Sequence, residues 1–262
     1  MADYVLRLSD EELGRYRMMA EMAEASEADA WQSAGIGPGA HVADVGCGPG
    51  AVLARLAARV GPEGRVAGVD ADPEAVGHAE AAVADAPQAT AQVGRADDTG
   101  LPAGAFDVAM CRHVLAHNGG GEGAIVDHLV GLVRPGGAVY LVDVDLTGLR
   151  IVPEHPAPDL DDRYRELLVR RGTDLMVGLR LGSYLEEAGL AVETYRCSAP
   201  VIHLPPTVRP PSWAARDALV EAGLADAADI ARWDADFTAS DAAAERPWLF
   251  APAFVAVGRR PG

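Results

Sequence analysis

Lysine is absent from this chain of 262 residues, and its 22 Lys or Arg residues are all arginine. Cysteine is scarce as well: there are three, and none belongs to a CxxC pair. An odd number without that spacing argues against a disulfide framework or a zinc knuckle and favours a reducing compartment. No apolar run reaches the roughly eighteen residues that span a membrane, and the first residues lack the pattern of a signal peptide. We therefore expect a cytoplasmic protein.

Positive charge is also in short supply, because the formal net charge is −17. Such a field repels nucleic acid and anionic membranes unless a local basic patch outweighs it. The pairs Arg170–Arg171 and Arg259–Arg260 are too isolated to form one. A small molecule is the expected partner, and a homodimer remains open. Exclusive use of arginine together with abundant alanine and glycine is typical of GC-rich bacterial coding.

Strands and helices alternate between residues 41 and 145. We expect strands over 41–45, 65–69, 90–93, 106–111 and 138–144, with a turn at 134–137 and helices over 51–60, 72–84 and 124–133. This alternation predicts a parallel sheet with helices on both faces. Further expected elements are helices over 8–30, 179–188 and 212–238, strands over 191–198 and 249–259, and a proline-rich linker over 200–211.

The segment 42–50, V-A-D-V-G-C-G-P-G, carries the strongest chemical signal. Glycines 46, 48 and 50 permit positive φ and close approach to a ligand, and a helix that starts here presents free N–H groups. The spacing G-x-G-x-G differs from the dinucleotide pattern G-x-G-x-x-G. Asp44, two residues before the first glycine, suits an ammonium group better than a pyrophosphate. The turn thus favours a cofactor with an ammonium, a sulfonium and a ribose over NAD.

Two further acids follow successive expected strands. Asp70 ends the second strand, where a carboxylate accepts hydrogen bonds from a ribose diol. Asp97 lies after the third strand, in G-R-A-D-D-T-G-L-P, where it can accept from the exocyclic amine of adenine.

These motifs resemble the ordered motifs of class I S-adenosylmethionine-dependent methyltransferases. The segments that carry the resemblance are Val42–Gly50, Val69–Asp70, Ala96–Pro102 with Phe106–Asp107, and Leu132–Gly137. The subgroup is similar to the ubiquinone/menaquinone C-methyltransferases. The resemblance implies an α/β fold, with a doubly wound, mainly parallel, seven-stranded Rossmann-like sheet. It also implies an N-terminal helical lid over 1–35 and a methyltransferase domain over 36–262. The cofactor half of that domain is 36–145, and acceptor-side insertions cover about 146–175 and 200–245.

The same resemblance implies the contacts of the cofactor, S-adenosylmethionine. The methionine end falls to Asp44 and the Gly46–Gly48 turn, the ribose to Asp70, and the adenine to Asp97 with the Asp98 backbone. The full set of expected cofactor residues is Tyr16, Asp44, Gly46, Cys47, Gly48, Asp70, Ala71, Ala96, Asp97, Asp98, Cys111 and Arg112. Cys47 is expected to serve as a small residue, and Met19 lies near Tyr16 on the lid.

Methyl transfer from a sulfonium is an in-line displacement that depends mainly on positioning. His113 and His117, just after the fourth strand, are the candidate bases or acceptor contacts, although either residue is also compatible with simple packing. Asp143 and Asp145 end the fifth strand, but the rest of a catechol-type metal pattern is missing, so no metal is expected. The aromatic residues of the insertions suggest an apolar acceptor pocket or, alternatively, helix packing: His155, Tyr164, Trp213, Trp233, Phe237 and Trp248.

The sequence therefore predicts methyl transfer to a small organic acceptor, with a secondary metabolite favoured by association. The atom methylated stays open. One alternative keeps the cofactor but uses it for a cyclisation or rearrangement. A nicotinamide oxidoreductase and a ligand-binding protein without catalysis are the others.

Overall fold

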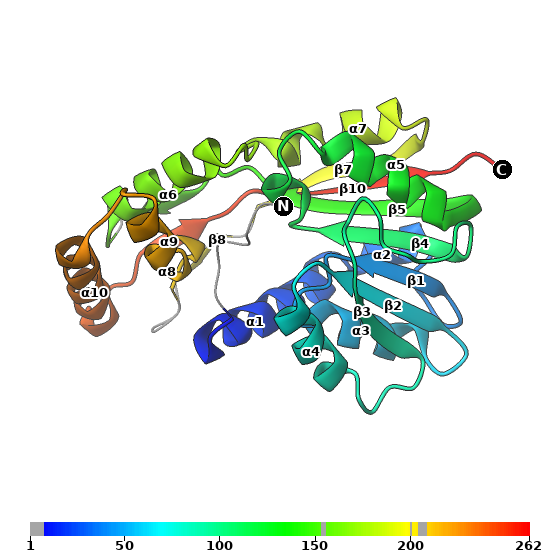
Figure 1. The fold of residues 1–262 in the computed structure, drawn as a ribbon, viewed down its shortest axis with the longest axis horizontal. Helices are drawn as coiled ribbons and strands as arrows, with labels where there is room; N and C mark the ends of the chain where they lie inside the picture. The colour runs from blue at the N-terminus through cyan, green and yellow to red at the C-terminus, as the bar shows by residue number, and fades with distance from the viewer. Residues whose placement is uncertain (1–7, 153–155, 200, 204–208) are drawn as a thin grey trace.

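Seven strands form the main sheet of the protein. Their bounds are β1 His41–Val45, β2 Arg65–Asp70, β3 Ala89–Val93, β4 Phe106–Arg112, β5 Val133–Val144, β7 Ala191–Ser198 and β10 Ala253–Arg259. The computed structural model describes residues 8–152, 156–199, 201–203 and 209–262. The strand order is β3-β2-β1-β4-β5-β10-β7 (Figure 1). Strands β1 to β5 pair in parallel, and β10 is antiparallel to both neighbours. The expected mainly parallel α/β sheet is confirmed.

Helices cover both faces of this sheet. Their bounds are α1 Asp10–Ser26, α2 Ala28–Ala34, α3 Ala51–Val60, α4 Pro73–Ala82, α5 Glu122–Leu132, α6 Pro158–Arg170, α7 Leu181–Glu187, α8 Pro211–Ala214, α9 Arg216–Glu221 and α10 Ala227–Ala242. Short 3₁₀ turns cover Leu115–His117 and Val177–Arg180. Within the described residues, none of these helices has the length and apolar character needed to cross a membrane.

Local sequence signals determine where several helices begin. The Ser9 side chain accepts a hydrogen bond from the Glu12 backbone N–H at the start of α1, as expected. The Glu12 carboxylate, expected to complete a capping box, instead accepts from Arg15. Asp72 caps α4, and Pro73 occupies its first turn. These starts place the glycine turn and the end of β2 at the same edge of the sheet.

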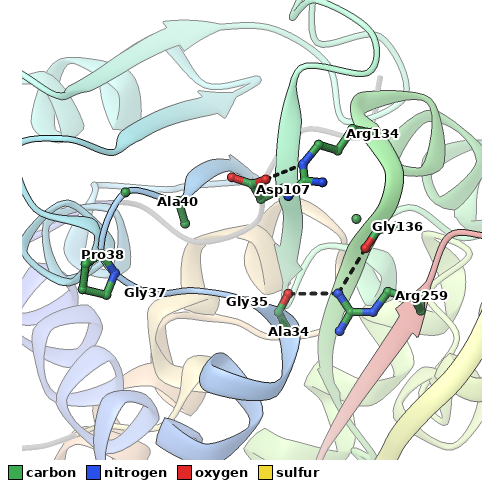
Figure 2. A pocket seen from close by; sticks show the side chains of 11 residues that line it. Ala34, Gly35, Gly37, Pro38, Ala40, Asp107, Arg134, Gly136 and Arg259 are labelled. Atoms are coloured by element: carbon green, nitrogen blue, oxygen red, sulfur yellow. Dashed lines mark hydrogen bonds and ion pairs between the residues drawn. The ribbon is translucent and has the colours of Figure 1, made fainter. Parts of the chain in front are cut away.

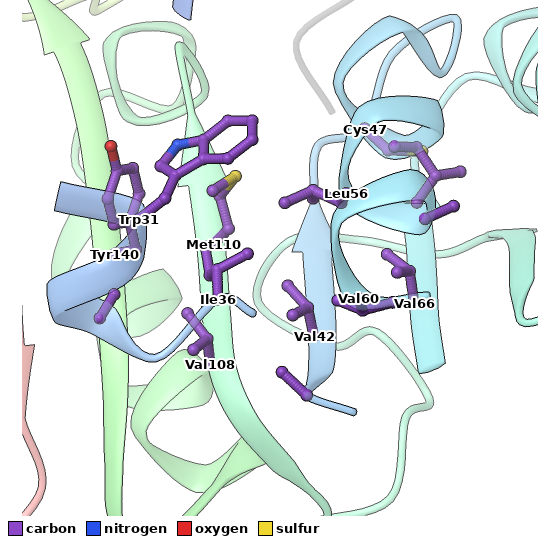
Figure 3. Packing of buried hydrophobic residues seen from close by; sticks show 14 of the residues in the cluster. Trp31, Ile36, Val42, Cys47, Leu56, Val60, Val66, Val108, Met110 and Tyr140 are labelled. Carbon is purple, nitrogen blue, oxygen red and sulfur yellow. The ribbon is translucent and has the colours of Figure 1, made fainter. Parts of the chain in front are cut away.

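Each face of the sheet has its own hydrophobic core. One core joins α2, α3 and α4 to the sheet, and Figure 3 shows Trp31 of α2 directed towards Met110 and Tyr140. The other core packs α5 and α7 on the opposite face, with Leu129 and Leu185 fully buried. Helix α2 is therefore part of the central packing of the domain.

A smaller three-stranded sheet extends the fold beyond the carboxyl end of β5. It contains β6 Arg150–Val152, β9 Trp248–Phe250 and β8 Val201–His203, in the order β6-β9-β8. This order repeats the order β5-β10-β7 of the main sheet, because each short strand adjoins one of those strands in sequence. Helices α6, α8, α9 and α10 gather beside it (Figure 1). We call these short strands and helices the cap.

The structure differs from the sequence-based expectations in several elements. The helix expected over 8–30 ends at Ser26, and α2 follows it. The turn expected at 134–137 lies within β5, where the pairing with β4 shifts register. The final strand expected over 249–259 divides into β9 and β10 at Pro252, because proline cannot donate to the ladder. The expected linker 200–211 contains β8, and the helix expected over 212–238 is three helices.

Candidate functional site

The glycine turn between β1 and α3 has the backbone that its sequence requires. Gly46, Gly48 and Gly50 have φ of +80°, +52° and +82°, a region that other residues rarely adopt. A Cβ on Gly46 would lie 2.1 Å from Cγ2 of Val114, and one on Gly50 would lie 2.6 Å from Cα of Ala79 in α4. Two of the glycines therefore serve packing as well as conformation.

Asp44 is the most unusual group at this turn. Its carboxylate is 2% exposed, and its Oδ2 has no hydrogen-bond partner among the described protein atoms. Burial raises the pKa of Asp44 from 3.8 to about 7; the nearby Arg112 opposes the shift, and Asp70 adds to it. A buried carboxylate without a partner needs a cation to balance it, so this position fits an ammonium group.

Asp70 holds the turn in place from the neighbouring strand. Its Oδ2 accepts from the Gly48 N–H at 2.8 Å, and its Oδ1 accepts from the Asp72 N–H at 3.0 Å. The expected ribose acid thus lies directly beside the glycine turn. Ala71 follows it on the exposed surface.

Arg112, expected among the cofactor residues, binds a carboxylate of the protein itself. Its Nη1 donates to Oε2 of Glu27 at the α1–α2 junction, and Tyr140 Oη donates to the same oxygen at 2.6 Å. The side chains of Arg112 and Glu27 are almost fully buried. This network joins the N-terminal helices to β4 and β5. The sequence analysis missed Glu27 and Tyr140, because they are far from Arg112 in the chain.

The segment after β4 crosses the front of the glycine turn. His113 has a φ of +55°, the only positive value among the described non-glycine residues. Its Nδ1 lies 4.0 Å from Oδ1 of Asp143, and its side chain is 28% exposed. Asp143 accepts from the backbone N–H groups of Ala116 at 3.1 Å and Val144 at 3.0 Å. Asp143 therefore fixes the shape of this segment.

Both candidate histidines are neutral at physiological pH. Exclusion of water from the imidazolium lowers the pKa of His113 to about 3, with further repulsion from Arg112 and Arg15. The same exclusion, with repulsion from Arg15, lowers the pKa of His117 to about 4. Neutral imidazoles accept hydrogen bonds, but groups with such low pKa values are weak bases.

The segment after β3 contains the acids expected at the adenine. Both oxygens of Asp97 accept from the exposed Arg95, at 2.8 and 2.7 Å. The backbone of Asp98 forms an isolated bridge with Arg95. Thr99 is buried, and its Oγ1 lies 2.8 Å from Nε2 of His128 on α5. Ala96 packs against the core of the same face. The role of Asp97 towards adenine stays a prediction.

Helix α1 lies over the glycine turn. A Cβ on Gly48 would be 3.5 Å from Cε1 of Tyr16, so the tyrosine ring covers this glycine. Arg15 lies 5.1 Å from the centre of the Tyr16 ring, and its Nη1 is 2.8 Å from the sulfur of Met19. Tyr16 and Met19, expected on the lid, therefore face the site.

The thiols and remaining acids at this edge are occupied by packing or local bonds. Cys47 and Cys111 are buried, and burial raises the pKa of both thiols. Asp145 accepts from the backbone and hydroxyl of Thr147. Among the described residues, no three His, Cys, Asp or Glu side chains form a cluster suited to a metal.

The aromatic residues of the insertions have two different placements. Trp213, Trp233 and Phe237 are buried in the core of the cap itself, so they hold its helices together. Trp248 is 42% exposed and lies against His203. Tyr164 of α6 is buried where Arg15 influences its pKa. His155 lies outside the described residues. The acceptor-pocket hypothesis is therefore left with Tyr164 among these aromatic residues.

A cavity of about 320 Å³ lies at the opposite, amino edge of the parallel strands (Figure 2). Its charged residues pair with one another or with the backbone: Arg134 Nε donates to Asp107 at 2.5 Å, and Arg259 donates to the carbonyls of Ala34 and Gly136. It lies at the far end of the strands from the glycine turn, and its polar groups are satisfied. We therefore do not assign it to the site.

Residues 42–150 match the family model described as a methyltransferase domain. They form a methyltransferase domain. Its fold is the one with which class I methyltransferases bind S-adenosylmethionine. A solved structure of an S-adenosylmethionine-dependent methyltransferase from Aquifex aeolicus has a TM-score of 0.54 and 14% identity, covering 96% of this chain and all but 1% of the other.

Two curated relatives match parts of the chain. A nocamycin O-methyltransferase from Saccharothrix syringae is 47% identical over 73 residues, which are 27% of this chain and 26% of that protein. An uncharacterized 37.1 kDa protein from a transposon of Streptomyces fradiae is 31% identical over 161 residues, 60% of this chain and 45% of that one. The chain thus matches less than half the length of either relative.

Proposed function

We propose that this chain transfers a methyl group from S-adenosylmethionine to a small organic acceptor. The buried, unpartnered carboxylate of Asp44 beside the glycine turn carries this proposal. A pyrophosphate cofactor would bring negative charge to a site that already holds Asp44 and Asp70. An α-ammonium group would supply the missing positive charge.

The residues of the turn divide the cofactor among themselves in this proposal. Asp44 binds the ammonium, and the backbone of Gly46 and Gly48 lies along the methionine end. Asp70 binds the ribose, and Asp97 exchanges its bond with Arg95 for the adenine amine. When bound, the cofactor supplies a methyl group activated by its positively charged sulfur.

Positioning contributes most of the catalysis, since His113 and His117 are too weakly basic to remove a proton from an alcohol or amine. The acceptor forms a bond to the methyl carbon as the carbon–sulfur bond breaks and its electron pair stays on sulfur. Holding these atoms in line is worth roughly 7–11 kcal/mol. His113→Asn and His117→Asn should therefore lower kcat by less than about tenfold. A loss of about 10²-fold or more would indicate general base catalysis instead.

The N-terminal and inserted segments surround the acceptor in this proposal. Helix α1 serves as the lid of the 1–35 segment, and the cap formed from about 146–175 and 200–245 covers the acceptor. The short sheet supports this placement, because it continues β5, β10 and β7 past the edge that holds the glycine turn. The Saccharothrix O-methyltransferase supports a secondary metabolite as acceptor.

Calorimetric titration tests the cofactor, with S-adenosylmethionine and NAD as ligands. The wild type should bind S-adenosylmethionine, and Asp70→Ala should lose that binding. Glu74→Ala, on the exposed start of α4, is the matched control and should retain it. Binding of NAD alone would overturn the assignment. Formation of S-adenosylhomocysteine with an acceptor then separates methyl transfer from a cyclisation or from ligand binding alone.

A further inference from the structure

Arg15 is placed by α1 in front of the glycine turn. It precedes Tyr16, whose ring covers Gly48, and its side chain is only 13% exposed. Its charge reaches His113 and His117 after β4, and Tyr164 on α6. The guanidinium therefore lies among the elements that enclose the candidate site, although α1 is outside the sheet.

The hydrogen bonds of Arg15 hold its guanidinium in one orientation. Nε donates to Oε2 of Glu12 at 2.9 Å, and Nη2 donates to Oε1 of the same carboxylate. Nη1 is directed at the sulfur of Met19 at 2.8 Å. A thioether is a weak acceptor, whereas a carboxylate oxygen forms a strong, charge-assisted bond with a guanidinium. A ligand carboxylate at this position would therefore give Nη1 a stronger acceptor than it has now.

The two ends of an amino-acid group require opposite charges close together. Asp44 suits the ammonium, so a cation is needed for the carboxylate. The guanidiniums that act on His113 are those of Arg112 and Arg15. Arg112 is buried against Glu27 and Tyr140, and the two histidines are neutral. Arg15 is the better placed of the two guanidiniums.

We propose that Arg15 binds the methionine carboxylate of the cofactor, so that lid helix α1 itself carries a cofactor-binding group. This inference rests on the proposed function. Glu12 acts as a positioning residue for the guanidinium. Because one end of the zwitterion contacts the sheet and the other contacts α1, the amino-acid group would hold the lid closed.

Three ligands separate the parts of this claim. S-adenosylhomocysteine has both charged groups, decarboxylated S-adenosylmethionine keeps only the ammonium, and 5′-methylthioadenosine lacks both. Their dissociation constants are measured by calorimetry for the wild type, Arg15→Met, Arg15→Lys and Asp44→Asn. Arg17→Met is the matched control, because Arg17 is an exposed arginine on the same helix.

Arg15→Met should weaken S-adenosylhomocysteine about tenfold to hundredfold, the range expected for a lost hydrogen bond to a charged group. It should change the affinity for decarboxylated S-adenosylmethionine and 5′-methylthioadenosine by no more than about twofold. Arg15→Lys should recover part of the loss, and Arg17→Met should match the wild type. Asp44→Asn should weaken the first two ligands and spare 5′-methylthioadenosine.

Two results would overturn the inference while leaving the cofactor proposal intact. One is an unchanged affinity of Arg15→Met for S-adenosylhomocysteine. The other is an equal loss for all three ligands, which would mean that Arg15 only holds α1 in place. If the wild type binds none of the three ligands, the cofactor proposal is wrong and this inference falls with it.

Discussion

Replacing Asp44 by asparagine should make the ligand-free protein more stable at pH 8. The carboxylate is buried, and its pKa is raised to about 7. The folded protein therefore binds this proton more tightly than the unfolded chain, whose aspartates titrate near 3.9. The contribution to stability is fully present below that value and is lost as the pH rises through about 7. Asparagine resembles the protonated form at every pH.

The size of the effect follows from the shift in pKa. A rise from 3.8 to about 7 at roughly 1.36 kcal/mol per unit gives about 4 kcal/mol of lost stability above pH 7. At pH 4 the loss is below about 1 kcal/mol, since Asp44 is then partly protonated in the unfolded chain as well. The stability difference between Asp44→Asn and the wild type should widen with pH between these limits.

Urea unfolding of the ligand-free proteins at pH 4, 6, 7 and 8 measures this difference. Asp72→Asn is the matched control, because asparagine caps a helix as well as aspartate does, and its difference from the wild type should stay small. A variant at Asp44 that is less stable than the wild type at pH 8 would refute the reasoning. So would a difference that does not change with pH.

The same substitution should abolish recognition of the cofactor's ammonium. Only the ionised fraction of Asp44 binds this group, so the wild-type affinity for S-adenosylhomocysteine should fall about tenfold per pH unit below 7. Stability and binding thus oppose each other at this carboxylate, as is common where a buried group serves a ligand. Calorimetry at pH 6 and 8 tests this, and equal affinities would contradict it.

Three further predictions concern packing around the site. Gly46→Ala should cost more than the roughly 1–2 kcal/mol of a left-handed backbone, because the new Cβ meets Val114; urea unfolding measures the loss, and Val114→Ala in the same chain should recover part of it. Glu27→Ala leaves Arg112 buried without its carboxylate and should cost about 3–5 kcal/mol; a shift of the unfolding midpoint worth less than about 1 kcal/mol would mean that water reaches the pair. Cys197 is exposed and the other two thiols are buried, so a thiol reagent should label one cysteine in the native protein and three in denaturant; rapid labelling of a second native thiol would contradict the packed glycine turn.

Local chemistry accounts for what the sequence predicted well. The segment from Val42 to Gly50 contains a strand, a turn that requires positive φ, and a helix start within nine consecutive residues. Asp72 and Pro73 likewise mark the start of α4 by their own bonding properties. The order of such segments predicted the parallel sheet, because strands joined by helices pair in parallel.

Long-range pairing accounts for what the sequence did not predict. Glu27 lies 85 positions from Arg112 and 113 from Tyr140, and nothing near any of them indicates the other two. The strands of the small sheet have three residues each, and Arg150 pairs with Phe250. Strands this short show no periodicity to recognise.

The sequence alone determined the cofactor turn, its acids and the sheet that holds them, because these depend on residues that are neighbours in the chain. Only the tertiary structure decided which charges are paired, which are buried and which face the site. Arg112 became a link to Glu27, the insertion tryptophans Trp213 and Trp233 became the core of the cap, and Asp44 kept its buried oxygen without a partner. The energy of a charge depends on the water and the partners around it, and distant parts of the chain supply or exclude both.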